Sequence, residues 1–324
     1  MVRFADPSAT AALAIPGPPR PKPVMPAPMG IGFACVPALP EALYTSDLID
    51  FVEVTPELFH RETRIDGSIQ LVPNQRPYDE ARRRCGALPV AMHGVELSIG
   101  AAHGMYEPCL TMMDRLQREW PFVWYSEHLQ FQTALDHDGS VMNTGVPLPL
   151  PATGEAACLV AGRAAAIQRR YGVPFLLENP AHYLPDLPSD ADIGDEFGLM
   201  NRITALSGCG QLLDLHNLYC NATNFGFDAE AALARIPMER VGEIHIAGGS
   251  WSDGFYMDGH DGRVPDTVWD LLEQTLSRAP WITGVVFEIL EEFLDRLGAD
   301  GIARELESAR VVWQRHHPPR DEPA

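Results

Sequence analysis

The chain has 324 residues, 46% hydrophobic and 21% charged, which is enough apolar sequence for one large α/β barrel or two ordinary domains. Its 24 Lys and Arg residues against 44 Asp and Glu residues give a formal net charge of −20, which would repel the phosphates of a nucleic acid. No apolar run approaches the ~20 residues that cross a bilayer, so we expect neither a nucleic-acid nor a membrane partner. The six cysteines are scattered without a Cys-x-x-Cys pair, which favours a reducing, cytoplasmic compartment.

Residues 1–28 combine Pro, Ala and small side chains without periodicity, which predicts a disordered Pro-rich tail. The structured part is expected over 29–317, followed by a flexible C-terminal tail at 318–324. Short apolar runs within it predict buried strands. These lie at 30–36, 50–54, 89–94, 122–128, 174–180, within 211–221, 240–249 and 284–289. Helical spacing alternates with them at 40–48, 106–120, 154–171, 196–206, 229–235, 266–277 and 292–316.

Eight apolar strands that alternate with helices are typical of a single (β/α)8 TIM barrel of the α/β class. A two-domain alternative would need a linker, and the only candidate is the Gly-, Asp- and Pro-rich stretch 136–151. The alternation of strands and helices resumes unchanged after it. We therefore predict one barrel, in which 136–151 forms a long loop after the fourth strand.

Carboxylate, imidazole and amide side chains end most of these strands, and in a TIM barrel the C-terminal strand ends surround the active site. The side chains at strand ends are His93, Glu127 or His128, Glu178, Asp214 with His216 and Asn217, His245 and Glu288. Either Glu53 or Glu57 ends the second strand, and Asp258 and His260 follow the seventh. Such N and O donors suit Fe, Mn or Zn. Crowded carboxylates would repel each other and take up protons unless cations were bound between them.

Each of these residues also has an ordinary structural interpretation. A lone His at a strand end is more often a satisfied polar residue than a ligand, and Pro180 after Glu178 and Asn179 can simply end a strand. Nucleophilic catalysis has less support, because Ser126 lies in no Gly-x-Ser-x-Gly turn. Gly30 and Gly32 lack the third glycine of a dinucleotide fingerprint. The metal hypothesis therefore rests on the recurrence of ligand-type residues at strand ends.

Taken together, the motifs resemble the DUF692 family of multinuclear non-haem iron-dependent oxidative enzymes, which includes the methanobactin biosynthesis enzyme. They are His-Gly-Val-Glu-Leu-Ser-Ile-Gly at 93–100, Ser-Glu-His-Leu at 126–129, Glu-Asn-Pro at 178–180, Leu-Asp-Leu-His-Asn-Leu-Tyr at 213–219, Glu-Ile-His-Ile-Ala-Gly at 243–248 and Asp-Gly-His at 258–260, followed by Val264, Pro265 and Trp269. They occur in the family's order, and the resemblance spans roughly residues 30–313.

The resemblance implies a TIM barrel that binds two or three irons as Fe2+ or Fe3+ and uses O2 to modify cysteine in a ribosomally made precursor peptide. It also implies a partner protein that presents this peptide. The ligands carried over by motif are His93, Glu178, Asp214, His245, Asp258, His260 and Glu288, with Asp214, His245 and Glu178 as catalytic residues. His216 and Asn217 compete for one neighbouring ligand position, and Glu127 and His128 are either ligands or residues that hold the ligands.

Two departures affect the expected metal count. Relatives commonly have a His and Glu-Asn after the second strand, where this chain has Thr55-Pro56-Glu57-Leu58, and His and Pro where Gly262 and Arg263 stand. One alternative is a Mn- or Zn-dependent isomerase or an endonuclease-like barrel that uses no O2. Another is a non-catalytic metal-binding protein that docks a partner through aromatic residues at 251–256.

Overall fold

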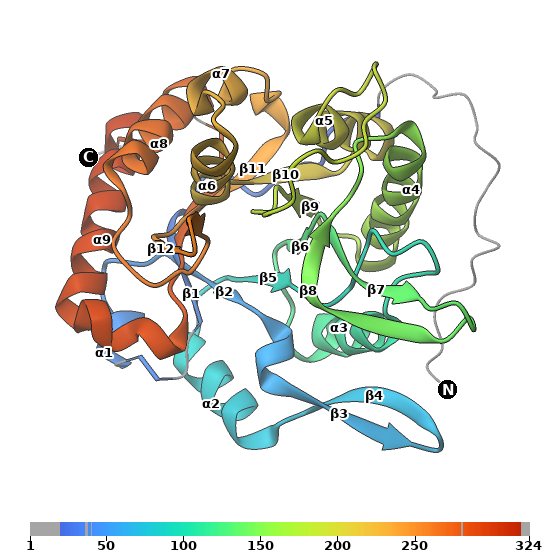
Figure 1. The fold of residues 1–324 in the computed structure, drawn as a ribbon. Coiled ribbons are helices and arrows are strands. Elements are labelled where there is room, and N and C mark those ends of the chain that lie inside the picture. The colour runs from blue at the N-terminus through green and yellow to red at the C-terminus, as the bar shows by residue number, and fades with distance from the viewer. Residues whose placement is uncertain (1–19, 36–37, 40, 280, 319–324) are drawn as a thin grey trace.

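The computed structural model describes residues 20–35, 38–39, 41–279 and 281–318, and its core is a closed barrel of eight parallel strands (Figure 1). Neighbouring strands follow the order β1-β14-β11-β10-β9-β6-β5-β2. The strands are β1 Gly30–Ala34, β2 Phe51–Val54, β5 Val90–Gly94, β6 Tyr125–His128, β9 Phe175–Glu178, β10 Gly210–Asp214, β11 Val241–Ile246 and β14 Gly284–Phe287. All eight predicted strands are present, and the predicted single TIM barrel is confirmed.

Helices surround the barrel, and their apolar faces pack on the outward side chains of the strands (Figure 1). They are α1 Glu41–Tyr44, α2 Gln75–Cys85, α3 Glu107–Glu119, α4 Gly154–Tyr171, α5 Glu196–Ser207, α6 Leu215–Phe225, α7 Ala229–Leu233, α8 Asp266–Arg278 and α9 Leu294–His316, with short 3-10 turns η2 Pro56–Phe59, η3 Met238–Arg240 and η4 Glu291–Phe293. None of the helices described is long and apolar enough to cross a membrane.

Helix α4 matches its predicted bounds because both of its ends carry clear signals. The Thr153 side chain accepts a hydrogen bond from the Ala156 backbone N–H, and Gly172 takes the left-handed conformation that ends the helix. Helix α6 was not predicted. Asp214 both ends β10 and caps α6, because its carboxylate accepts from the Asn217 N–H at 2.7 Å. The polar residues expected to continue the strand end therefore form the first turn of a helix.

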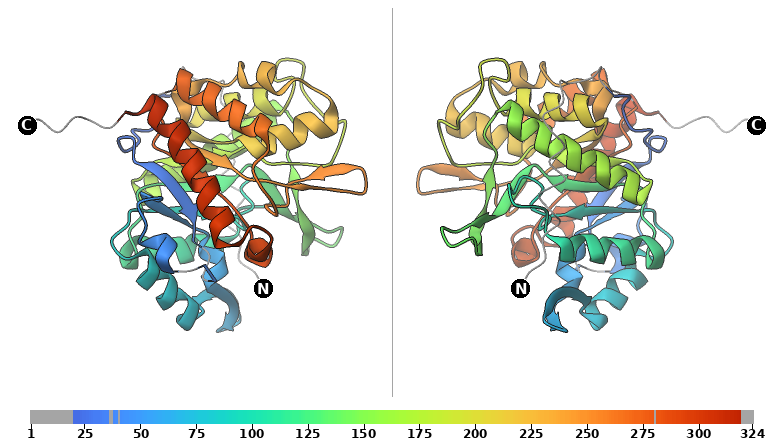
Figure 2. Two further views of the ribbon diagram at one scale, coloured as in Figure 1. Left: turned by 90° about the vertical axis from the view of Figure 1, so that its left-hand side faces the viewer. Right: turned by 90° about the vertical axis from the view of Figure 1, so that its right-hand side faces the viewer.

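Three hairpins extend from the loops that follow barrel strands β2, β6 and β11. They are β3 His60–Ile65 with β4 Ser68–Pro73, β7 Gln130–Leu135 with β8 Val141–Pro149, and β12 Ser250–Ser252 with β13 Phe255–Met257. The β7–β8 hairpin replaces the long loop expected at 136–151, whose Gly and Asp residues form its tight turn. The β7–β8 and β12–β13 hairpins project on the same side of the barrel, beside its mouth (Figure 2).

The segment 20–28 packs against the N-terminal end of the barrel. The Arg20 N–H donates to the Ala205 carbonyl at 2.9 Å, and the Thr283 hydroxyl donates to the Pro26 carbonyl at 3.1 Å. Met25 and Met29 contact the apolar side chains that fill the lower barrel, which are Phe51, Ala91, Trp124, Leu176, Leu212 and Val286. The expected tail at 1–28 thus includes a packed segment, while 1–19 and 319–324 lie outside the described residues.

Replacing Met25 with alanine should lower the free energy of unfolding by about 1–2 kcal/mol, because Met25 is partly buried against the lower barrel. Its neighbour Val24 is 90% exposed, so Val24→Ala should change stability by less than about 0.5 kcal/mol. Urea unfolding followed by circular dichroism measures both variants. Equal losses in the two variants would show that Met25 contributes no packing.

Candidate metal centre

The barrel strands place apolar side chains in the lower barrel and polar ones at its mouth. Side chains two residues apart on a strand point to the same face, so each inward apolar residue is followed by an inward residue nearer the mouth. Such pairs are Phe51 and Glu53, Ala91 and His93, Trp124 and Ser126, Leu176 and Glu178, Leu212 and Asp214, and Val286 and Glu288. The strand period therefore brings nitrogen and oxygen side chains from six strands into the upper barrel and its mouth.

Glu178 lies between two imidazoles at the end of β9. Its Oε2 is 3.2 Å from His93 Nε2 and 3.2 Å from His128 Nε2, yet it is buried and has no hydrogen-bond partner among the described residues. Its Oε1 accepts from the Asn217 side-chain amide at 3.0 Å. Three ligand atoms that lie this close together without hydrogen-bond geometry between them are typical of a metal site.

The backbone and one serine hold both imidazoles in the tautomer that a metal requires. The Ser126 hydroxyl donates to the Met92 carbonyl at 3.3 Å, so it accepts from His93 Nδ1 at 3.0 Å. His128 Nδ1 donates to the Gly94 carbonyl at 3.3 Å. Both Nε2 lone pairs are then free to bind a cation. Burial, followed by the neighbouring imidazoles of His128 and His245, also lowers the pKa of His93 well below its usual value, which keeps it neutral.

Replacing Ser126 with alanine should weaken metal binding about 10- to 100-fold, because His93 would lose the contact that fixes its ring. Ser98→Ala is the matched control: Ser98 is also buried, but its hydroxyl accepts from the Gln132 N–H at 2.9 Å, outside the centre. Competition with a coloured chelator measures the affinity. Wild-type affinity in Ser126→Ala would remove Ser126 from this role.

His245 on β11 lies between two carboxylates. Its Nε2 is 3.0 Å from Glu53 Oε2 deeper in the barrel, and its Nδ1 is 3.0 Å from Glu288 Oε2 at the mouth. Burial alone would lower the pKa of His245, but Glu288 and Glu53 raise it well above its usual value. Because Nδ1 is buried without hydrogen-bond geometry, it is the atom that a cation at the mouth would bind, while Glu53 holds Nε2–H.

A third group forms where the chain leaves the β12–β13 hairpin. Asp258 Oδ1 is 2.8 Å from His216 Nδ1 and 2.9 Å from His260 Nε2, and His260 Nε2 lies 3.8 Å from Glu288 Oε2. His260 adopts φ 45°, a left-handed conformation that non-glycine residues hold mainly where the surrounding structure requires it. Burial would raise the pKa of Asp258, but the imidazoles of His260 and His216 lower it well below its usual range.

Asp214 joins these groups at the centre of the mouth. Its ligand atoms lie within 4.8 Å of those of Glu178 and His245. While its Oδ1 caps α6, its Oδ2 is buried and accepts no hydrogen bond from any residue that the structure describes. Burial, together with the charges of Asp258 and Glu288, raises the pKa of Asp214 to about 6. Carboxylates this crowded favour protonation unless cations neutralise them, so the donor set fits bound divalent metal.

Ten of the eleven predicted metal ligands gather at the mouth. They are His93, His128, Glu178, Asp214, His216, Asn217, His245, Asp258, His260 and Glu288. Asn217 Oδ1 is buried and has no hydrogen-bond partner in the part of the chain that the structure describes, and His216 Nδ1 lies 2.8 Å from Asp258 Oδ1, so both residues lie at the mouth.

Glu127 differs from the other predicted ligands, because its side chain lies on the opposite face of β6 from His128. Its Oε1 accepts from the Tyr125 hydroxyl at 3.0 Å, and burial together with the Glu57 charge raises its pKa well above the usual value. Burial likewise raises the pKa of Glu57, to about 7, and Glu57 accepts from the Val95 N–H at 3.3 Å. Of the two candidates on the second strand, Glu53 therefore reaches the centre and Glu57 does not.

Sequence reasoning left out two residues that hold the site. Asn179 brackets Asp214 with two hydrogen bonds, from its Nδ2 to the Asp214 carbonyl at 2.8 Å and from the Asp214 N–H to its Oδ1 at 3.0 Å. Trp124 donates its indole N–H to Glu243 Oε2 at 2.7 Å below the mouth. The sequence contained a signal for Trp124, because Trp124 lies two residues before Ser126 and therefore points to the same inward face of the strand.

The comparisons with known proteins identify the family of the chain. Residues 28–311 match the family model described as RiPP precursor modification enzyme MbnB/TglH/ChrH, where RiPP denotes a ribosomally synthesised and post-translationally modified peptide. The chain belongs to this family. It is 36% identical over 269 residues to a UPF0276 protein of Rhizorhabdus wittichii, covering 83% of this chain and 88% of that protein. A UPF0276 protein of Caulobacter vibrioides is 35% identical over 289 residues, 88% of this chain and 94% of its own length. The resemblance predicted from the motifs is confirmed.

Solved structures with a similar fold are TIM-barrel sugar epimerases and isomerases. L-ribulose 3-epimerase has a TM-score of 0.51 at 15% identity and covers 90% of this chain and 99% of its own. A xylose isomerase domain protein from Planctomyces limnophilus has a TM-score of 0.53 at 12% identity and covers 90% and 99%. At these identities the likeness concerns the fold alone. Family membership, not fold similarity, identifies the chain as a RiPP precursor modification enzyme.

Proposed function

We propose that this enzyme binds two or three iron ions at the barrel mouth and uses O2 to modify a cysteine of a precursor peptide. The observation that carries the proposal is the overlap of the ligand groups. One group holds His93, His128 and Glu178, the next His93, His245 and Glu288, and a third His216, Asp258 and His260. Shared residues and neighbouring carboxylates make these groups one continuous centre, which suits several ions held side by side.

The donor chemistry supports iron. Imidazole and carboxylate ligands without a thiolate are typical of non-haem iron, manganese and zinc sites. Cys220 lies near the centre, with Sγ 3.8 Å from His216 Nε2, and burial followed by the charges of Asp258 and Asp214 raises its pKa. When bound, iron would supply the electrons that O2 reduction requires and a position for the substrate thiolate.

Asp214, His245 and Glu178 are the residues to which we assign the catalytic role. His245 is common to three groups of ligand atoms, and Asp214 and Glu178 share one of them with it. Each is at most 2% exposed. Their task would be to fix the spacing of the ions and to exclude water from the lower side, with Glu53 and Asn179 holding His245 and Asp214 in place.

The surface around the mouth supports a peptide substrate. Large apolar side chains are exposed on the loops and hairpins that follow β2, β6, β9, β11 and β14. They are Leu58, Leu135, Met142, Val146, Leu184, Trp251, Phe255 and Leu290, with exposures of 37% to 66%. All eight side chains belong to segments that follow the C-terminal ends of barrel strands, and exposed apolar groups on such segments can bind a partner. We propose that the precursor peptide and a peptide-presenting partner protein bind there, in the cytoplasm.

The test combines anaerobically purified, iron-loaded protein with a Cys-containing precursor peptide and a partner protein encoded beside its gene. Mass spectrometry should detect a change in the peptide only after O2 is admitted, and a peptide with Ser in place of Cys should stay unchanged. Binding of Mn or Zn without O2 consumption would instead favour an isomerase. Binding of iron without alteration of any thiol-containing peptide would favour a non-catalytic metal protein. The net charge of −20 disfavours an endonuclease.

A further inference from the structure

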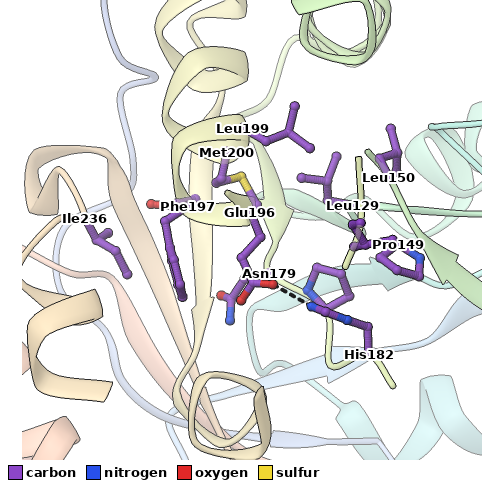
Figure 3. A pocket seen from close by; sticks show the side chains of 13 residues that line it. Leu129, Pro149, Leu150, Asn179, His182, Glu196, Phe197, Leu199, Met200 and Ile236 are labelled. Carbon is purple, nitrogen blue, oxygen red and sulfur yellow. Dashed lines mark hydrogen bonds and ion pairs between the residues drawn. The ribbon is translucent and has the colours of Figure 1, made fainter. Parts of the chain in front are cut away.

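Two adjoining hollows lie outside the metal centre, between the β9–α5 loop and the helices α5, α6 and α7. The outer hollow has a volume of about 300 Å³ and the inner one about 30 Å³. His182, Glu196 and Phe197 line both, so the two hollows adjoin at these residues, and we call them together the depression; Figure 3 shows these side chains in the inner hollow. The inner hollow ends at Asn179, the residue that brackets Asp214 at the metal centre. Neither hollow contains a proposed metal ligand.

His182 supplies an unused hydrogen-bond acceptor in this depression. Its side chain is 8% exposed, and its Nε2 lies 2.6 Å from Glu196 Oε2. The Glu196 Oε1 accepts from the Asn221 side-chain amide at 3.1 Å, which fixes the carboxylate. In the tautomer whose Nε2–H donates to this carboxylate, Nδ1 carries a lone pair, and within the described part of the chain this buried atom has no hydrogen-bond partner. A buried acceptor without a donor destabilises the protein until a ligand supplies one.

The walls around His182 suit a flat ring. Phe197, Phe225 and Phe227 line the outer hollow, and the His182 ring stacks on Phe225 at 4.8 Å and 25°. The charges of Asp195 and Arg235 neutralise each other in a bidentate pair at 2.6 and 2.8 Å. Glu196 and Asp228 would repel an anion, and the lining of the inner hollow is largely apolar.

We propose that this depression binds an aromatic ring that carries one hydrogen-bond donor, a phenol or an indole. The ring would lie among the phenylalanines, and its O–H or N–H would donate to His182 Nδ1. Such a ring occurs free in small molecules and as the side chain of Tyr or Trp in a peptide. That the ring is a Tyr or Trp side chain of a peptide rests on the proposed function, whereas the preference for a ring with a hydrogen-bond donor does not.

Binding of 4-fluorophenol and fluorobenzene to the full-length, metal-loaded protein tests the proposal, with 19F NMR as the measurement. The phenol should bind about tenfold more tightly, because only it can donate to His182 Nδ1. His182→Phe should remove this difference. Ala231→Phe should abolish binding of both probes by filling the outer hollow, which Ala231 lines, whereas Ala234→Phe, on the same helix end but outside the lining, should leave binding unchanged.

Equal affinity for the two probes would overturn the proposal, as would binding that survives Ala231→Phe. The Ala231 variant keeps the test decisive if His182→Phe does not fold. Displacement of 4-fluorophenol by acetyl-Gly-Tyr-Gly-amide would assign the site to a peptide side chain, and failure of this peptide to displace it would assign the site to a free ring compound. None of these measurements requires turnover, so their failure would leave the proposed metal chemistry untouched.

Discussion

Replacing His245 with alanine should remove bound metal and reduce peptide modification by at least about 1,000-fold. His245 belongs to three groups of ligand atoms at the mouth and is fully buried between Glu53 and Glu288. Without the imidazole, those two carboxylates would face each other at the centre, so the remaining donors would bind cations weakly. Metal content per chain after gel filtration, measured together with the modification rate, tests this expectation.

The control for this variant is His137→Ala, in the exposed turn of the β7–β8 hairpin. It should keep the metal content and activity of the wild-type protein. A His245→Ala protein that modifies peptide while free of metal would contradict the proposed function directly. Circular dichroism would verify that both variants remain folded, so that a loss of metal is not a consequence of unfolding.

Replacing Glu178 with glutamine should remove about one ion per chain, because the site between His93 and His128 loses the carboxylate oxygen that lies 3.2 Å from each ring. The group formed by His216, Asp258 and His260 does not include Glu178 and should keep its cation. Activity should fall with the lost ion. Elemental analysis of metal per chain distinguishes this partial loss from the larger loss expected for His245→Ala.

Glu127 provides a matched control, because it is also a buried glutamate on a neighbouring strand. It lies on the opposite face of β6 from His128, and its raised pKa keeps its carboxyl protonated. Glu127→Gln then replaces one neutral group with another of similar shape and should keep the full metal content. A loss of metal equal to that of Glu178→Gln would mean that Glu127 takes part in the centre.

The sequence predicted the barrel well because its strands are buried on both faces. Such strands form continuous apolar runs, and each of the eight runs became a barrel strand. The three hairpins were not predicted, because most of their residues are exposed or half-buried and their polar side chains resemble those of loops. Helix α6 was missed for a different reason: Asp214 ends a strand and caps a helix at the same time. No separate turn marks the boundary between the two elements.

The sequence predicted which residue types form the candidate site, but it did not predict which of two neighbouring side chains points into the barrel. In a four-residue strand, adjacent polar residues point to opposite faces, and the sequence alone does not say which one points inward. This explains why Glu127 and His128 remained alternatives, whereas Glu53 and Glu57 did so because the sequence did not show that β2 ends at Val54 and that Glu57 lies in the turn η2. In the structure, the side chains of Trp124 and Phe51 fill the lower barrel, which shows which face of each strand points inward. His128 and Glu53 then follow at inward positions.

The measurement that tests the central claim most directly is the metal content of the protein purified without O2. We expect at least two iron ions per chain, with Mössbauer spectra that contain more than one iron environment. His93 joins the first two groups of donors, and His260 Nε2 of the third lies 3.8 Å from Glu288 Oε2 of the second, so His245→Ala should lose more iron than Glu178→Gln. A stoichiometry of one ion or fewer in the wild-type protein, or a full complement of zinc or manganese with no affinity for iron, would contradict a multinuclear iron centre.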